Sequence, residues 1–144
     1  DDGTQNNGTP LISSKFFTIT NTPAFLKRPP GILESLRVVP NPYNIASRDF
    51  QYGVSAPDRL MFLNIPGECT IKIFTERGDL IKTIDHTDGS GDEAWNLVTS
   101  GRQVIVPGIY IAHIKVTSDI LSSDQESVLI QKGDSRVLKF VVVR

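Results

Sequence analysis

One cluster of side chains in this sequence has the right types to bind a metal ion. An acidic loop that also contains glycines carries four carboxylates, at Asp85, Asp88, Asp92 and Glu93. Carboxylate oxygens on a flexible loop suit Ca²⁺. The spacing does not follow an EF-hand, which needs acidic residues at alternate positions and a distal glutamate. We therefore expect a solvated hairpin loop here, with calcium binding as the less favoured alternative.

The sequence offers few other groups for catalysis. Its histidines are His86 and His113, and its single cysteine is Cys69. A catalytic triad needs a histidine beside a nucleophile and a carboxylate, but strand neighbours such as Asp85 and His86 point to opposite faces. We expect both histidines to lie on the surface and Cys69 to be a half-buried strand residue. The sequence thus predicts no catalytic residue, no cofactor and no enzymatic activity.

The tripeptide Arg77-Gly78-Asp79 joins two strand-like segments. Integrin ligands display this tripeptide at a hairpin tip, so adhesion is one interpretation. Tight turns favour the same residue types, and Gly78 would supply the positive φ of a hairpin with a bulge. The turn is the better interpretation.

Short strands would position these groups. We expect strands over residues 35–39, 59–64, 69–75, 80–85, 93–98, 108–117 and 136–143, and an extra hairpin around 127–131. Turn signals built on proline and glycine separate these segments every ~8–12 residues, which is typical of an antiparallel sandwich or barrel. No long segment shows a helical period.

Alternation along the strands predicts which residues form the core. In the strand over 108–117, one face carries Tyr110, Ala112, Ile114 and Val116. Trp95, the only tryptophan, should anchor the core from the middle of its strand. The last strand is apolar on both faces near its end, because Val141 and Val143 oppose Phe140 and Val142. We therefore expect something to cover its outer face.

The first part of the chain, residues 1–34, has the character of an arm. Its segment 14–20 is rich in aromatic and β-branched residues, which indicates a strand. A proline-rich connector follows, and the domain proper spans 35–144. A spare strand can add to an open sheet edge in cis or in trans. The expected partner-binding residues are Phe16, Phe17 and Ile19 in the arm, and Val141 and Val143 in the last strand.

Composition limits the classes of partner. The chain has 144 residues, enough for one ordinary domain, and a formal net charge of -1. A nucleic-acid partner needs a concentrated positive field, which this balance argues against. No apolar stretch approaches the ~20 residues of a membrane-spanning helix.

An ordered set of landmarks resembles a known family. It comprises Val39-Pro40-Asn41-Pro42-Tyr43, the hairpin of 69–74 with 80–84, Gly91-Asp92-Glu93-Ala94-Trp95-Asn96, Val106-Pro107-Gly108-Ile109-Tyr110, and the closing segment 139–144. The order is similar to the immunoglobulin-like domain of flagellar hook-capping proteins and to the related C-terminal sorting domains of type IX secretion cargo. One departure is Leu97, which stands where the family often has glycine. The resemblance implies an extracellular location and no catalysis.

Together these features predict an all-β fold. We expect an antiparallel immunoglobulin-like β-sandwich of about seven strands, preceded by an extended arm that carries one extra strand. The first functional hypothesis is a non-catalytic extracellular subunit of a surface filament or sheath. Strand donation from the arm would join it to other copies of itself or to a neighbouring β-domain. The alternative is the C-terminal sorting or anchoring domain of a larger protein secreted by the type IX system.

Overall fold

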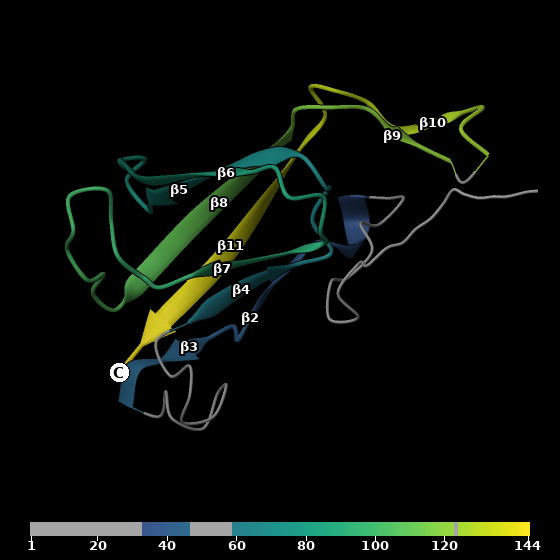
Figure 1. The fold of residues 1–144 in the computed structure, drawn as a ribbon. Helices are drawn as coiled ribbons and strands as arrows, with labels where there is room; N and C mark the ends of the chain where they lie inside the picture. Colours follow the sequence, from purple (N-terminus) through teal and green to yellow (C-terminus); the bar gives the residue numbers. More distant parts are fainter. Residues whose placement is uncertain (1–32, 47–58, 123) are drawn as a thin grey trace, which may run out of the picture.

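The computed structural model describes residues 33–46, 59–122 and 124–144. Its strands form a five-stranded sheet, a three-stranded sheet and a two-stranded ribbon (Figure 1). The expected strand at 14–20 and its proline connector lie outside the described residues. Among the described residues, no helix is long and apolar enough to cross a membrane.

The smaller sheet has the order β2-β4-β7. It is built from β2 (Arg37–Val39), β4 (Leu60–Leu63) and β7 (Asp92–Trp95), and a short 3-10 helix, η2 (Leu33–Ser35), precedes it. Burial alternates along β4, where Leu60 and Phe62 are buried and their neighbours are half-buried. This period of two is the pattern of a strand with one face on a core.

The larger sheet has the order β3-β11-β8-β5-β6. Its strands are β3 (Tyr43–Asn44), β5 (Cys69–Thr75), β6 (Leu80–His86), β8 (Gly108–Val116) and β11 (Ser135–Val143). All its pairs are antiparallel except the short pair of β3 with β11, which is parallel. The sets β2-β4-β7 and β11-β8-β5-β6 correspond to the A-B-E and G-F-C-C′ strands of an immunoglobulin-like sandwich.

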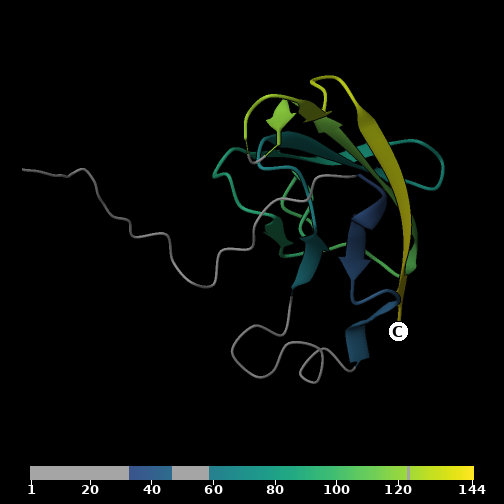
Figure 2. The same cartoon turned by 90° about the vertical axis from the view of Figure 1, so that its right-hand side faces the viewer.

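The two-stranded ribbon extends the connection between β8 and β11. It pairs β9 (Ile120–Leu121) with β10 (Val128–Ile130). Figures 1 and 2 both show the ribbon at the end of the sandwich opposite the C-terminus. The expected hairpin around 127–131 is therefore present, with 120–121 as its other strand.

A tyrosine corner lies at the start of β8. The Tyr110 hydroxyl donates a hydrogen bond to the Val106 carbonyl, with an O···O distance of 2.7 Å. Immunoglobulin-like sandwiches carry this motif near the start of the F strand, two residues before a cysteine in antibody domains. Ala112 occupies that cysteine position, and Cys69 lies in β5 as a free thiol. Packing between the described residues must therefore join the sheets without a disulfide.

Aromatic side chains centred on Phe140 join the two sheets. The Phe140 ring, on β11, makes edge-to-face contacts with Phe62 and Trp95 of the smaller sheet, at centroid distances of 6.5 and 6.3 Å. It stacks on Tyr110 within its own sheet at 5.6 Å. Each such contact contributes roughly 0.5–1.5 kcal/mol beyond simple burial. The expected core role of Trp95 is confirmed, and its indole N–H donates to the Val98 carbonyl at 2.9 Å.

The expected strands are present with small shifts at their ends. The first strand begins at Arg37 because η2 occupies Leu33–Ser35. β7 ends at Trp95, short of residue 98, because Leu97 adopts a left-handed backbone with φ 65°. The inward residues expected in β8 are all buried, at Tyr110, Ala112, Ile114 and Val116.

The β5–β6 hairpin turns as expected at Gly78, whose φ is 96°. The ladder shifts register between Ile73 and Phe74, which is the expected bulge. Asp79 belongs to the turn, because its N–H donates to the Thr75 hydroxyl at 3.1 Å. Gly78 and Asp79 of the Arg-Gly-Asp tripeptide thus form and stabilise the hairpin turn.

Candidate partner-binding surface

The acidic loop encloses a buried histidine. The His86 side chain is 0% exposed, which contradicts the expectation of a surface residue. Loop 87–91 folds back over the imidazole as the chain crosses from β6 to β7. The imidazole Nδ1 lies 2.8 Å from Glu93 Oε2, and Nε2 lies 2.9 Å from the Ser90 carbonyl oxygen and 3.2 Å from Asp88 Oδ1.

These contacts define the protons on the ring. A carbonyl oxygen only accepts hydrogen bonds, so Nε2 of His86 must carry a proton toward Ser90. The Nδ1 contact with Glu93 Oε2 is a second hydrogen bond of the ring. His86 therefore ties β6 of the larger sheet to β7 of the smaller one.

Cys69 lies directly opposite His86 in the β5–β6 ladder. The thiol is buried rather than half-buried as expected. Burial raises its pKa to about 12, and the nearby Glu93 carboxylate acts in the same direction. A nucleophilic cysteine needs a lowered pKa, so this Cys–His–Glu grouping keeps the thiol protonated. The hairpin register could have revealed the pair from the sequence, because pairing across Gly78 places residue 69 opposite residue 86.

The four carboxylates proposed for calcium do not converge. Asp85 accepts a hydrogen bond from the Thr70 hydroxyl at 3.1 Å, whereas Asp88 and Glu93 contact His86. Asp92 leaves Oδ1 buried without a hydrogen-bond partner. Within the described ranges, no group of three or more histidine, cysteine or acidic residues could hold a metal ion. The calcium alternative thus has no support from the geometry.

The edge of β11 is covered over only part of its length. β8 pairs with β11 from Ser135 to Val142, but β3 pairs on the other side at Val142 and Val143 alone. The Asn41 side chain continues the coverage, because its amide N–H₂ donates to the Lys139 carbonyl and its oxygen accepts from the Val141 N–H. Among the described residues, no strand pairs with this edge of β11 over 135–138.

The expected partner-binding residues of β11 lie beside this edge. Val141 and Val143 are half-buried on the outer face of the sheet, and Val137, on the same face, is 58% exposed. The arm residues Phe16, Phe17 and Ile19 lie outside the described residues. The position of Asn41 between two prolines marked it as a turn residue. Its hydrogen bonds to the edge of β11 were not predicted from the sequence.

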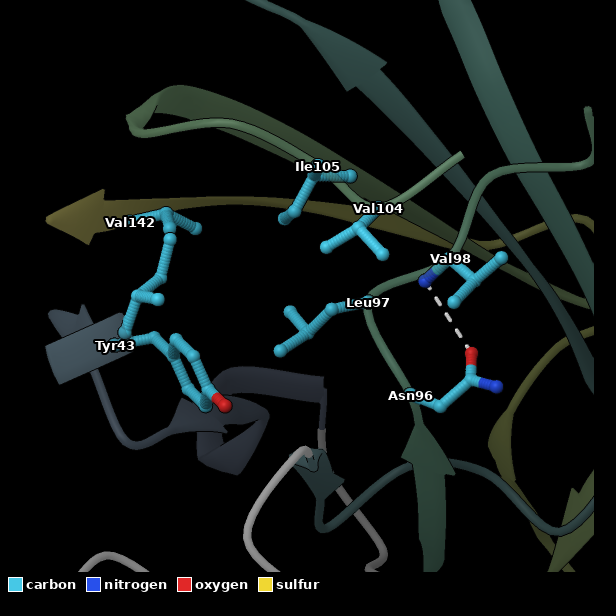
Figure 3. A pocket seen from close by; sticks show the side chains of 8 residues that line it. Tyr43, Asn96, Leu97, Val98, Val104, Ile105 and Val142 are labelled. Carbon is cyan, nitrogen blue, oxygen red and sulfur yellow. Dashed lines mark hydrogen bonds between the residues drawn. The ribbon is translucent and has the colours of Figure 1, made fainter. Parts of the chain in front are cut away.

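A small apolar pocket opens near the C-terminal end of β11. Its volume is about 240 Å³, and its lining residues are Tyr43, Ile45, Asn96, Leu97, Val98, Val104, Ile105 and Val142. Figure 3 shows Tyr43 and Val142 on one side and the side chains of segment 97–105 on the other. Val104 is 70% exposed. The pocket has the size and chemistry to receive one apolar side chain of a partner.

Leu97 shapes this pocket through an unusual backbone. Its φ of 65° is a conformation that glycine adopts freely and leucine does not. The family resemblance places glycine there, and the left-handed backbone gives the physical reason. The Leu97 carbonyl accepts from the Ile105 N–H at 3.0 Å, and its side chain is 5% exposed. Burial of the side chain offsets the backbone strain.

Comparison with known proteins gives a likeness at the level of structure. No protein-family model matches the sequence, and no curated protein is detectably similar in sequence. Among solved structures, the fold resembles part of PorZ, described as an essential bacterial surface component of the type IX secretion system of Porphyromonas gingivalis. The TM-score is 0.51 and the identity 18%, over 78% of this chain and 12% of the PorZ chain. This likeness shows that the chain shares its fold with that small part of PorZ.

Proposed function

We propose that this chain is a non-catalytic extracellular module of a bacterial surface protein handled by the type IX secretion system, and that it acts as a sorting or anchoring domain. The observation that carries this proposal is the structural likeness to one small part of PorZ. The buried Cys69 thiol, which lies opposite His86, is consistent with this proposal, because burial raises its pKa to about 12 and a nucleophilic cysteine needs a lowered one.

In this proposal, a partner contacts β11 both at its uncovered edge and on the outer face of the sheet. This strand combines an outward apolar side chain, Val137, with an edge that lacks a neighbouring strand among the described residues over 135–138. Extended segments bind such edges through main-chain hydrogen bonds and place alternate side chains in pockets. The apolar pocket beside Tyr43 lies at the far end of the same strand.

A reporter fusion tests the sorting role. The 144-residue chain is fused to the C-terminus of a periplasmic reporter in a bacterium with an intact type IX system, and surface exposure is measured with external protease. We expect the reporter at the surface only when the chain is fused and the system is intact. A reporter that remains in the periplasm, or one that reaches the surface in a secretion-deficient strain, would contradict the role.

A second candidate function is assembly into a filament or sheath by strand donation. The uncovered edge of β11 favours it. The Asn41 side chain covers this edge at Lys139 and Val141, and a donated segment would pair with the remaining edge over 135–138. The segment 14–20 of another copy is the proposed donor. Electron microscopy of the full chain beside a variant that lacks residues 1–22 tests this: filaments that vanish with the arm support it, and monomers in both samples count against it.

A further inference from the structure

The outer face of the larger sheet has an open hollow that is positively charged. Its volume is about 610 Å³, and its lining residues are Thr70, Lys72, His113, Lys115, Val116, Thr117, Lys132 and Gly133. This hollow lies on the opposite face of the sheet from the core, and nothing in the proposed sorting role uses it.

The β5–β8 ladder gathers two of the lysines. Lys72 stands directly opposite His113, and Thr70 stands directly opposite Lys115. The residues between them, Ile71 and Ile114 among others, are buried in the core, so these four side chains share the outer face. Directly opposed Cβ atoms lie roughly 4.5–5.5 Å apart and diagonal neighbours roughly 7–8 Å apart. Lys72 and Lys115 therefore project into one small area.

A structured turn brings the third lysine to the same place. The Gly133 N–H donates to the Val116 carbonyl at 2.9 Å, and the Val116 N–H donates to the Asp134 carbonyl at 2.8 Å. The Lys132 N–H donates to Asp119 Oδ1 at 2.7 Å. These bonds attach the turn to the end of β8, and Lys132 is consequently held beside the sheet by its backbone.

None of the residues that line the hollow is acidic. Among the described residues, no ion pair is formed by Lys72, Lys115 or Lys132. Several carboxylates, Glu68 among them, lie around the hollow without lining it. Asp119 accepts from a backbone N–H as above, Asp134 Oδ2 accepts from the Gln131 N–H, and Asp85 accepts from the Thr70 hydroxyl, and these bonds fix the carboxylates outside the lining. Lys72 and Lys115 are diagonal neighbours on one face of the sheet, and an anion bound between them would reduce their mutual repulsion.

We propose that this hollow binds the phosphate group of an anionic ligand. Lysine ammonium groups bind phosphate as mobile point charges, and three of them approach from two strands and a turn. The Thr117 hydroxyl and the ring N–H of His113 add further donors at the rim. The shared chemistry is a tetrahedral oxoanion, whether free in solution or carried as an ester on a larger molecule.

The test is a titration of the full chain with inorganic phosphate at constant ionic strength, followed by amide chemical shifts. Saturable shifts at residues 115–117 and 132–133 are expected. The variant Lys115→Gln should bind phosphate about tenfold more weakly, because one charge-assisted hydrogen bond is lost. The matched control Lys139→Gln removes a lysine from the same face outside the hollow and should bind as the wild type does.

A second titration with glycerol phosphate separates the two sources. Tighter binding of the ester would assign a phosphate carried on an organic group, and tighter binding of the inorganic ion would assign free phosphate. Equal shifts with sodium chloride, or equal weakening in both lysine variants, would show general screening and overturn the proposal. Thermal denaturation without phosphate checks the fold, and Lys115→Gln should be as stable as the wild type because it relieves repulsion.

Discussion

The two faces of the five-stranded sheet are made by alternate residues of the same strands, yet they serve different purposes. The inner face is apolar and buried around Phe140, and it packs on the smaller sheet. The outer face carries exposed lysines at one end and exposed or half-buried valines along β11. The comparison indicates that stability depends on the inner residues and that outer residues can change with little loss of stability.

The largest expected effect comes from removing the aromatic centre of the inner face. Phe140→Ala should lower the free energy of unfolding by about 3–5 kcal/mol, because it leaves a cavity among three other rings. Urea denaturation measures this loss. The control Val141→Ala changes the next residue, which points to the other face, and should cost about 1 kcal/mol or less. Similar losses in both variants would remove the distinction between the faces.

A smaller loss is expected where a hydrogen bond, rather than apolar packing, joins the sheets. Glu93→Gln weakens the 2.8 Å contact with the buried His86 ring and should cost about 1–3 kcal/mol. Asp85→Asn is the control, because it changes a carboxylate of β6 that contacts the Thr70 hydroxyl rather than His86. Denaturation curves at neutral pH should separate the two variants. A cost for Asp85→Asn equal to that for Glu93→Gln would contradict the role of His86.

Glycine usually makes a fold less stable than alanine does, but the left-handed backbone at Leu97 predicts the opposite order. Leu97→Ala and Leu97→Gly both lose the buried side chain, but only glycine adopts φ 65° without strain. The glycine variant should therefore be more stable than the alanine variant by about 1 kcal/mol. Thermal melts of the two variants make the comparison. Greater stability of the alanine variant would show that the left-handed backbone is not maintained in solution.

The smallest effect concerns acid sensitivity in the loop that covers His86. The Ser90 N–H donates to the Asp88 carboxylate and holds the pKa of that group below its usual range. A lowered pKa in the folded state stabilises the fold above the unfolded-state pKa, and this contribution is lost as pH falls through the folded value. Asp88→Asn should therefore be less stable than the wild type at neutral pH, and the difference should shrink in acid. A difference that does not change with pH would contradict this role.

Much of the sandwich could be predicted from the sequence, because a strand reveals its faces by alternation. Tyr110, Ala112 and Ile114 could be assigned to the core on this basis alone. His86 could not, since its burial depends on a loop that returns over it and on Glu93 of a strand in the other sheet. The basic hollow also depends on pairing between strands and on the turn at Lys132, which have no local signature.

In the proposed function, β11 contacts a partner through its uncovered edge and the outer face that carries Val137. Surface exposure of the reporter fusion is measured for Val137→Asp, beside Val128→Asp as a control at an exposed valine of the two-stranded ribbon, outside β11 and outside the apolar pocket. Both variants should fold, because Val137 and Val128 are both exposed. We expect Val137→Asp to prevent the reporter from reaching or remaining at the surface and Val128→Asp to leave it there. Normal surface exposure of the folded Val137→Asp fusion would contradict the claim.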